Sequence, residues 1–167
     1  GRWGSTWKMA FAITEPDAGS NSHEITTTAR PDGAGWQISG TKYWTSGIDE
    51  ADAVLVVTRM PDAGPDGRHP LSLFVVPTGA PGLSFQHIEA ALQQPEHQFT
   101  VFFDDVAVGP EALIGEAGRG LRQVFAGLNP ERITAACISN GIARYALDKA
   151  TRYANERQVW KTPIGAH

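Results

Sequence analysis

The stretch FAITEPDAGSN, residues 11–21, joins an apolar, strand-like start to a polar turn. Pro16 and Gly19 bend the chain here, and glycine tolerates the close approach of a ligand. Main-chain N–H groups flanked by Thr14 and Ser20 could donate hydrogen bonds to a phosphate or to a heteroaromatic ring. The same residues could also form an ordinary surface turn, so taken alone they leave both interpretations open.

A second stretch, KYWTSG at residues 42–47, favours binding. Trp44 is a large flat aromatic beside the hydroxyls of Thr45 and Ser46, at the end of a predicted strand. An aromatic wall, small hydroxyl donors and a glycine turn together suit a planar cofactor. The alternative is that Trp44 is a core residue, since tryptophan is usually mostly buried.

Other kinds of site have little support. The five histidines follow no HxH or HExxH spacing and there is no CxxC pair, so no metal site is predicted. No G-x-S-x-G motif is present, which gives no support to hydrolase chemistry. The glycines of residues 115–120 lack the G-x-G-x-x-G spacing and are interpreted as a connection between two halves of the chain.

Composition describes a globular chain of 167 residues, 41% hydrophobic and 19% charged. A net charge of -4 without any Lys/Arg-rich run gives no support for nucleic-acid binding. The apolar runs are far shorter than the roughly 20 residues that span a bilayer. Cys137 is the single cysteine and cannot form an internal disulfide, which favours a reducing compartment. We expect a bacterial cytoplasm, with the mitochondrial matrix as the alternative.

The elements that must position these residues differ between two halves. Up to about residue 116 the hydrophobic pattern has a period of two, with glycine and proline clusters between the runs. This predicts a middle β domain at residues 1–116, an antiparallel barrel or sandwich of about seven strands. The predicted strands include Ile25–Arg30, Gly35–Gly47 with a central turn or bulge at Ser39-Gly40, Asp52–Arg59, Leu71–Thr78, Leu83–Ile88 and Gln98–Val108.

Residues 117–167 have a helical period and are predicted to begin a helical domain, so the fold class is α+β. Leu121, Phe125 and Leu128 share one face of a short helix. Asn129-Pro130 is typical of a helix start, and a second helix is predicted from there to near Arg157. An amphipathic helix of close to thirty residues needs partners on its apolar face. The chain is therefore expected to be a fragment of something longer.

Together these pieces resemble the acyl-CoA dehydrogenase family, and the resemblance spans nearly the whole chain in the family's order. The similar stretches are FAITEPDAGSN, ISGTKYWTSG, GLSF, FFDDVAV, LIGEAGRGL, LNPERITAA, GIARYALDKATRYANER and KTPIGAH. The resemblance implies an FAD enzyme with an N-terminal helical domain, a middle β-barrel and a C-terminal helical bundle. The chain would hold the barrel and the first long helix of the bundle.

The resemblance also implies roles for individual residues. Phe11 and Ala12 would belong to the flavin-binding turn, the main chain and hydroxyl around Ile13 and Thr14 would bind the pyrimidine end of the flavin, and Gly19 and Ser20 would approach the FAD pyrophosphate. Trp44 and Thr45 would flank the flavin, and the Ser46 hydroxyl would donate to flavin N5. Ser20, Asn129 and Arg132 would meet the acyl-CoA, and Arg157 would reach the FAD of a neighbouring subunit in a tetramer or dimer.

The implied reaction is dehydrogenation of an acyl-CoA to a trans-2-enoyl-CoA, with electron-transfer flavoprotein as the acceptor. Glu131 occupies one position that the family uses for the catalytic base, and the other position would lie beyond His167. The alternatives are a flavin-free structural subunit of a hetero-oligomer, and an acyl-CoA oxidase or flavin monooxygenase on the same scaffold. Outside the resemblance, Glu131 is simply an acidic residue in the first turn of the predicted helix.

Overall fold

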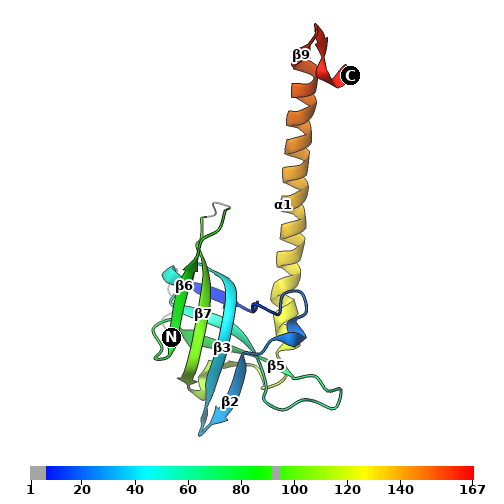
Figure 1. Cartoon of the computed structure of the whole chain (residues 1–167). Helices are drawn as coiled ribbons and strands as arrows, with labels where there is room; N and C mark the ends of the chain where they lie inside the picture. Colours follow the sequence, from blue (N-terminus) through cyan, green and yellow to red (C-terminus); the bar gives the residue numbers. More distant parts are fainter. Residues whose placement is uncertain (1–6, 92–94) are drawn as a thin grey trace. The chain divides into compact units, whose positions relative to one another are not determined.

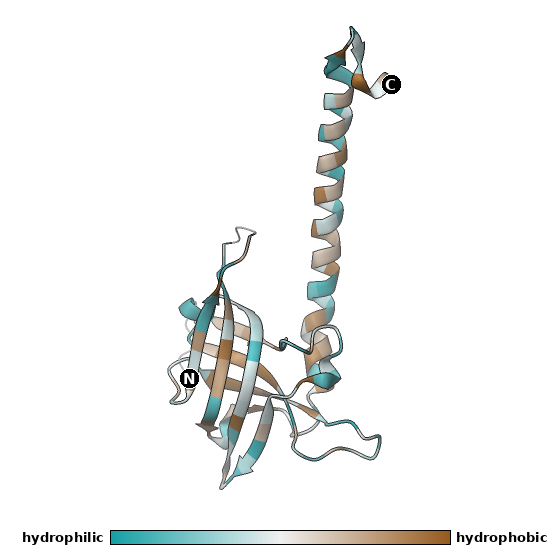
Figure 2. Ribbon diagram, in the orientation of Figure 1, coloured by the Kyte–Doolittle hydropathy of each residue, from teal (hydrophilic) through white to brown (hydrophobic). Residues whose placement is uncertain are grey.

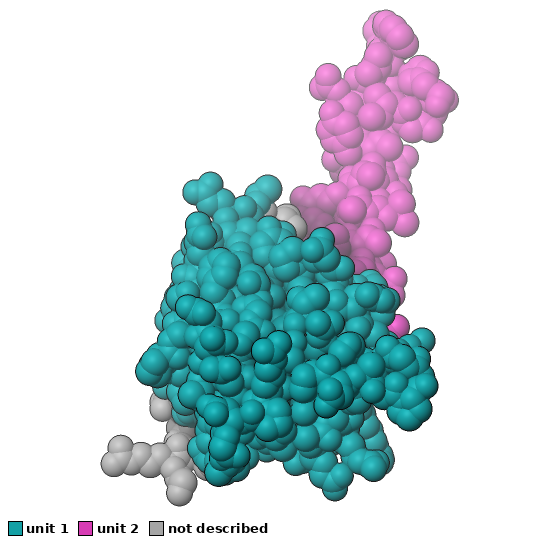
Figure 3. All heavy atoms as spheres, turned by 60° about the horizontal axis from the view of Figure 1, so that its bottom comes forward, with its two compact units in different colours: residues 1–124 teal, residues 125–167 magenta. Residues whose placement is uncertain are grey.

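The structure, a computed structural model, describes residues 7–91 and 95–167 of the chain. These residues form two compact units that divide between Val124 and Phe125, coloured teal and magenta in Figure 3. The first unit is a β domain. The second contains most of one long helix and a short hairpin that follows it (Figure 1).

Eight strands of the described residues form one sheet in the order β6-β7-β3-β2-β4-β5-β8, with β1 also paired to β4. Most neighbours are antiparallel, while β1 and β2 each pair with β4 in parallel. The strands are β1 Met9–Ala12, β2 Thr28–Asp32, β3 Gly35–Ser46, β4 Ala53–Arg59, β5 Leu71–Pro77, β6 Leu83–Ile88, β7 Gln98–Val108 and β8 Leu113–Ile114. Short 3-10 turns lie at η1 Ser22–Glu24, η2 Ile48–Glu50 and η3 Pro110–Ala112.

The predicted α+β architecture, a mostly antiparallel sheet followed by a long helix, is confirmed. The predicted strand at residues 25–30 is displaced, since β2 begins only at Thr28. The cause is local, because the N–H groups of Thr26 and Thr27 donate to the Glu15 carboxylate and not to a neighbouring strand. A continuous core supports the sheet, built mainly from Ile38, Val54, Val56, Phe74, Val76, Phe99, Val101 and Phe103.

The predicted irregularity at Ser39-Gly40 is confirmed, because the β3–β7 register shifts between Ile38 and Gly40. Gly40 has φ +148°, and a Cβ there would lie 2.6 Å from the Thr27 Cα. Glycine therefore lets β3 pass directly against the main chain of Thr27. A second register shift lies between Lys42 and Thr45, just where the candidate binding residues of β3 begin.

The helical half differs from the prediction. A single helix, α1, runs through Leu121–Glu156, with Pro130 inside it. The prediction of a helix start at Asn129-Pro130 was therefore wrong, although the predicted end near Arg157 is confirmed. Proline fits helical φ and removes only one main-chain hydrogen bond, here the one to the carbonyl four residues earlier. Glu131 and Arg132 follow Leu128 at the next two positions of the same helix face, and apolar residues at helical spacing resume beyond them at Ala135, Ile138 and Ile142.

Helix α1 presents large apolar side chains that the described residues do not cover. Figure 2 shows brown, hydrophobic residues on successive turns of the helix. Six of them are more than half exposed, namely Ile133, Ile138, Ile142, Tyr145, Leu147 and Tyr153. A helix that is apolar on more than one face is typical of the interior of a helical bundle.

A tight hairpin follows α1. Its strands are β9 Gln158–Val159 and β10 Thr162–Pro163, and the 3-10 turn η4 Ile164–Ala166 comes after them. The two turn residues, Trp160 and Lys161, both have positive φ. This is the pattern of a two-residue hairpin turn that usually prefers asparagine or glycine.

Candidate functional site

The turn after β1 is held against β3, so the two stretches singled out in the sequence lie next to each other. The Tyr43 N–H donates to the Thr14 carbonyl at 2.7 Å, and the Lys42 ammonium donates to the Ile13 carbonyl at 3.0 Å. The turn closes on itself through paired main-chain bonds between Glu15 and Ala18. The segment from Ile13 to Ala18 is therefore tied both to itself and to β3.

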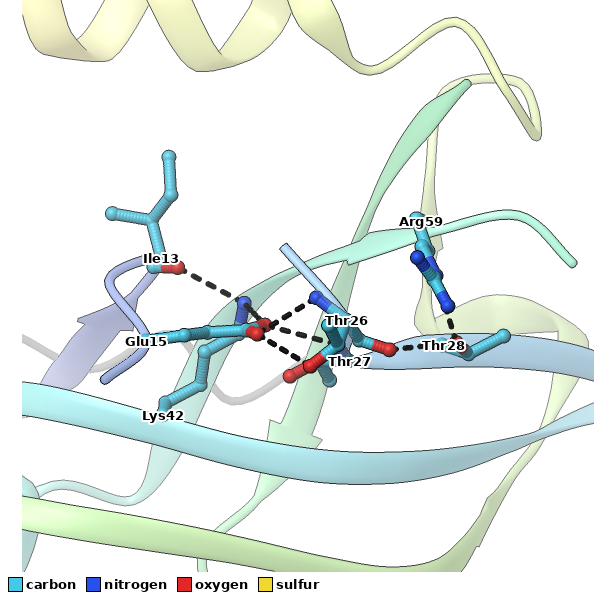
Figure 4. Close-up of polar contacts among 7 residues, drawn as sticks. All are labelled: Ile13, Glu15, Thr26, Thr27, Thr28, Lys42 and Arg59. Carbon is cyan, nitrogen blue, oxygen red and sulfur yellow. Dashed lines mark hydrogen bonds and ion pairs between the residues drawn. The ribbon is translucent and has the colours of Figure 1, made fainter. Parts of the chain in front are cut away.

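A buried ion pair lies beneath this turn (Figure 4). Lys42 Nζ lies 2.9 Å from Glu15 Oε1, and both side chains are almost completely buried. Oε1 also accepts from the Thr27 N–H at 2.9 Å, while Oε2 accepts from the Thr26 N–H and hydroxyl, each at 2.7 Å. Both carboxylate oxygens thus have two donors, as a buried charge requires.

These contacts change the protonation of both partners. Burial by itself would raise the pKa of Glu15, but the positive charge of Lys42 and the hydrogen bonds to the carboxylate outweigh burial and lower the pKa from 4.5 to about 2. Burial lowers the pKa of Lys42 from 10.5 to about 8, although the Glu15 charge opposes this shift. Both groups are therefore charged at neutral pH.

The lowered pKa of Glu15 predicts an acid-sensitive fold. Between pH 4.5 and about 2 the unfolded chain binds a proton that the folded chain does not, so the free energy of unfolding falls as the pH falls through this window. We expect Glu15→Gln to be less stable at neutral pH and to lose less stability across the window. Urea unfolding at several pH values measures both effects. The exposed Glu111, as Glu111→Gln, is the control and should keep the wild-type pH dependence.

Trp44 and Ser46 form the exposed face of the end of β3. Trp44 is 47% exposed and has φ +59°, a left-handed conformation that costs a non-glycine residue about 1–3 kcal/mol. The interpretation of Trp44 as a core residue is therefore wrong. Ser46 is also exposed, and its Oγ lies 2.9 Å from Nε2 and 3.1 Å from Oε1 of Gln98. An aromatic side chain and a hydroxyl group are thus both exposed at this end of β3.

Thr45 differs from its two neighbours, because its side chain is completely buried and its Oγ1 has no hydrogen-bond partner among the described residues. Any contact of Thr45 with a cofactor would have to use its main chain. In the preceding turn Phe11, Ile13 and Thr14 are half-buried and Ala12 is buried, while Gly19 and Ser20 are exposed. The end of the turn that was predicted to approach a phosphate is therefore open to solvent.

The remaining candidates lie on or after α1. Asn129, Glu131 and Arg132 are exposed and share one turn of the helix. Glu131 is the eleventh residue of α1, counting from Leu121, which is too far from the N-terminus for the helix dipole to explain it. Arg157 follows the helix end, and its N–H donates to the Tyr153 carbonyl at 2.8 Å. At a rise of about 1.5 Å per residue, Arg157 lies more than about 35 Å along the axis from Arg132.

Within residues 7–91 and 95–167, no cluster of three or more His, Cys, Asp or Glu side chains could hold a metal ion. No helix in the same residues has the length and apolar character needed to cross a membrane.

Comparison with known sequences identifies the family. The family model described as "Acyl-CoA dehydrogenase, middle domain" matches residues 10–106, and the "Acyl-CoA dehydrogenase, C-terminal domain" matches residues 118–167. The chain belongs to the acyl-CoA dehydrogenase family. The predicted domain boundary between residues 116 and 117 falls between the two matched ranges and stays a prediction.

Individual members of the acyl-CoA dehydrogenase family are similar over most of the chain. Acyl-CoA dehydrogenase FadE12 of Mycobacterium tuberculosis is 57% identical over 159 residues, which are 95% of this chain and 41% of that protein. The structure of a glutaryl-CoA dehydrogenase in complex with glutaryl-CoA has a TM-score of 0.79 at 36% identity and covers 95% of this chain and 40% of its own. An acyl-CoA dehydrogenase of Bacillus anthracis complexed with FAD has a TM-score of 0.76 at 32% identity, and the match covers 93% of this chain and 27% of that protein. This chain thus spans less than half the length of these relatives.

The Glu15–Lys42 pair was not predicted from the sequence, although both residues lie inside the two stretches FAITEPDAGSN and KYWTSG. Lys42 lies between Gly40 and Trp44 in a strand of alternating pattern, where an inward charged residue requires a partner. That alternation was the available signal. It could not identify the partner, because Glu15 is 27 residues away in sequence and on a different element.

Proposed function

We propose that this chain is the central part of an FAD-dependent acyl-CoA dehydrogenase, which converts an acyl-CoA thioester to a trans-2-enoyl-CoA. The observation that carries this proposal is the joining of the Ile13–Ser20 turn to the exposed Trp44 and Ser46 by direct hydrogen bonds to β3. Family membership and the FAD-bound relative support it. The exposed polar end of the turn would bind the FAD pyrophosphate, and Trp44 would pack against the flavin ring system.

The donor set suits FAD. The carbonyls of Ile13 and Thr14 are both used by β3, and in a trans peptide the N–H points opposite to the carbonyl. The Thr14 N–H therefore points away from Lys42 and could donate to a carbonyl oxygen or a nitrogen of the flavin ring. Trp44 supplies an exposed aromatic face and Ser46 an exposed hydroxyl.

When bound, FAD would accept the β-hydrogen of the substrate as a hydride. The protein must remove the α-proton and stabilise the negative charge that develops on the thioester oxygen. We assign proton removal to Glu131, because it occupies one of the positions at which the acyl-CoA dehydrogenase family carries its catalytic base, and its carboxylate is exposed on α1. Asn129 and Arg132, in the same helical turn, would contact the acyl-CoA.

We propose that the enzyme works as an assembly of identical subunits. Arg157 would contact the FAD of a neighbouring subunit in a homotetramer or homodimer, and the uncovered apolar faces of α1 would pack against further helices of a bundle. Electrons would leave to an electron-transfer flavoprotein. The bacterial relative and the single cysteine favour a bacterial cytoplasm, with the mitochondrial matrix as the alternative.

Anaerobic addition of acyl-CoA substrates to the flavin-loaded full-length enzyme tests the reaction. We expect the flavin absorbance to bleach and trans-2-enoyl-CoA to form in equal amount, with slow return of the absorbance when air is admitted. Rapid return in air would support an acyl-CoA oxidase or monooxygenase. A folded protein that binds neither flavin nor acyl-CoA would support a structural subunit, and either result would overturn the proposal.

Ser46→Ala in the full-length enzyme is expected to slow flavin reduction by about tenfold or more, because the hydroxyl stabilises charge that arrives on the ring at N5. Folding should be preserved, since one hydroxyl contributes only about 0.5–1.5 kcal/mol. Stopped-flow reduction by a good substrate measures the rate. Ser46→Thr is the matched control and should be nearly silent because it keeps the hydroxyl. An Ala variant that reduces its flavin at the wild-type rate would remove Ser46 from the site.

The isolated 167-residue chain is expected to bind FAD and CoA weakly and to show no turnover. Large apolar side chains of α1 remain uncovered in it, and contacts from neighbouring subunits are missing. A product assay with several acyl-CoA chain lengths checks this expectation. Measurable formation of enoyl-CoA by the isolated chain would contradict it.

A further inference from the structure

Stability alone is a weak explanation for the buried Glu15–Lys42 pair. Replacing a buried ion pair with apolar residues of similar volume is often neutral or stabilising, so such a pair is weak evidence for a stabilising role. Removing only one partner is costly, because the other charge then stays buried and unpaired.

The feature that an apolar pair could not supply is the bond from Lys42 to the main chain of the turn. Lys42 Nζ lies 3.0 Å from the Ile13 carbonyl oxygen, and Figure 4 shows this bond beside the one to Glu15. The next carbonyl, that of Thr14, accepts from the Tyr43 N–H at 2.7 Å. Two consecutive peptide planes are thus fixed by two consecutive residues of β3.

Because these peptide planes are fixed, the direction of a main-chain N–H donor is fixed as well. The described residues contain no cis peptide bond, so the Thr14 N–H points opposite to the Ile13 carbonyl and away from Lys42. Glu15 in turn holds the ammonium in place, and is itself held by Thr26 and Thr27. The charge on Glu15 keeps Lys42 protonated at neutral pH in spite of its burial, and only the protonated form offers donors to both acceptors.

We propose that Lys42 is a positioning residue for the cofactor, which acts through the Ile13 carbonyl to aim the Thr14 N–H at the edge of the flavin ring. This inference rests on the proposed function and adds to it a residue that would touch no part of the cofactor. Preorganised main-chain donors of this kind bind a ligand without the cost of ordering the turn on binding.

The test compares FAD affinity and thermal stability in the full-length enzyme for three variants. Lys42→Met removes the ammonium. The double variant Glu15→Gln/Lys42→Met also removes the buried negative charge, and so is expected to fold where the single variant does not. Val76→Ala is the control, because it creates a cavity at a buried position of β5, a strand that pairs with β4 and β8 and not with β3.

We expect FAD to bind at least about tenfold more weakly to each Lys42 variant that folds, which corresponds to the loss of one well-oriented hydrogen bond. Val76→Ala should lower the melting temperature of the apo protein but leave the FAD dissociation constant within about twofold, since its change lies outside the site. The inference is overturned if the folded double variant binds FAD as tightly as wild type. It is also overturned if Val76→Ala weakens FAD binding as much as the Lys42 variants do. Wild-type protein that binds no FAD would instead refute the proposed function.

Discussion

Replacing Gly40 with alanine is expected to lower the free energy of unfolding by about 3 kcal/mol or more. Gly40 has φ +148°, a region of backbone space that is nearly restricted to glycine. The added Cβ would lie 2.6 Å from both the Thr27 Cα and the Thr27 Oγ1, and main-chain atoms cannot move aside cheaply. Thr27 also donates to Glu15, so the damage should extend to the turn that carries the candidate flavin contacts.

Urea unfolding followed by circular dichroism measures the loss. Gly79→Ala is the matched control, because its Cβ would meet no atom within 4 Å and its φ is not positive. We expect this control to stay within about 0.5 kcal/mol of wild type. If Gly40→Ala were as stable as Gly79→Ala, the close contact between β3 and Thr27 would be wrong.

The second large effect is expected at Glu131. If its carboxylate removes the α-proton, Glu131→Gln in the full-length enzyme should slow flavin reduction by about 10²–10⁴-fold. Glutamine and glutamate have similar helix propensity, so α1 should form as in wild type. Stopped-flow reduction under anaerobic conditions measures the rate, and circular dichroism checks the fold.

Glu156→Gln is the control for this variant. Glu156 is also an exposed carboxylate of α1, but it is the last residue of the helix and far from Glu131, so its loss should leave the rate of flavin reduction unchanged. A wild-type rate in Glu131→Gln would place the base outside this chain and would leave Glu131 as a surface residue.

The sheet could be predicted from sequence because alternation along a strand reports which face is buried. The runs that became β4, β5, β6 and β7 were predicted nearly to the residue, and the irregularity before Gly40 was marked by glycine. The parallel pairing of β1 with β4 could not be predicted, because Met9–Ala12 and Ala53–Val56 are 44 residues apart and an apolar run does not specify its partner.

Local signals failed where a distant contact competed with them. Asn129-Pro130 has the chemistry of a helix start, yet apolar residues at helical spacing resume beyond it and one lost hydrogen bond does not end the helix. Thr26 and Thr27 have strand propensity, but a carboxylate eleven or twelve residues earlier takes their N–H groups. Trp44 and Ser46 could be proposed as site residues from residue type alone, whereas the Lys42 bond to the Ile13 carbonyl depends on the folded arrangement.

Binding of FAD by the turn and by the end of β3 is the claim on which the other proposals depend. Purified full-length protein can be scanned for visible absorbance before and after addition of FAD and removal of the excess. A bound flavin spectrum is expected, together with a higher melting temperature because a ligand of the folded state stabilises it. A folded, colourless protein that gains neither a flavin spectrum nor stability from added FAD would contradict the claim.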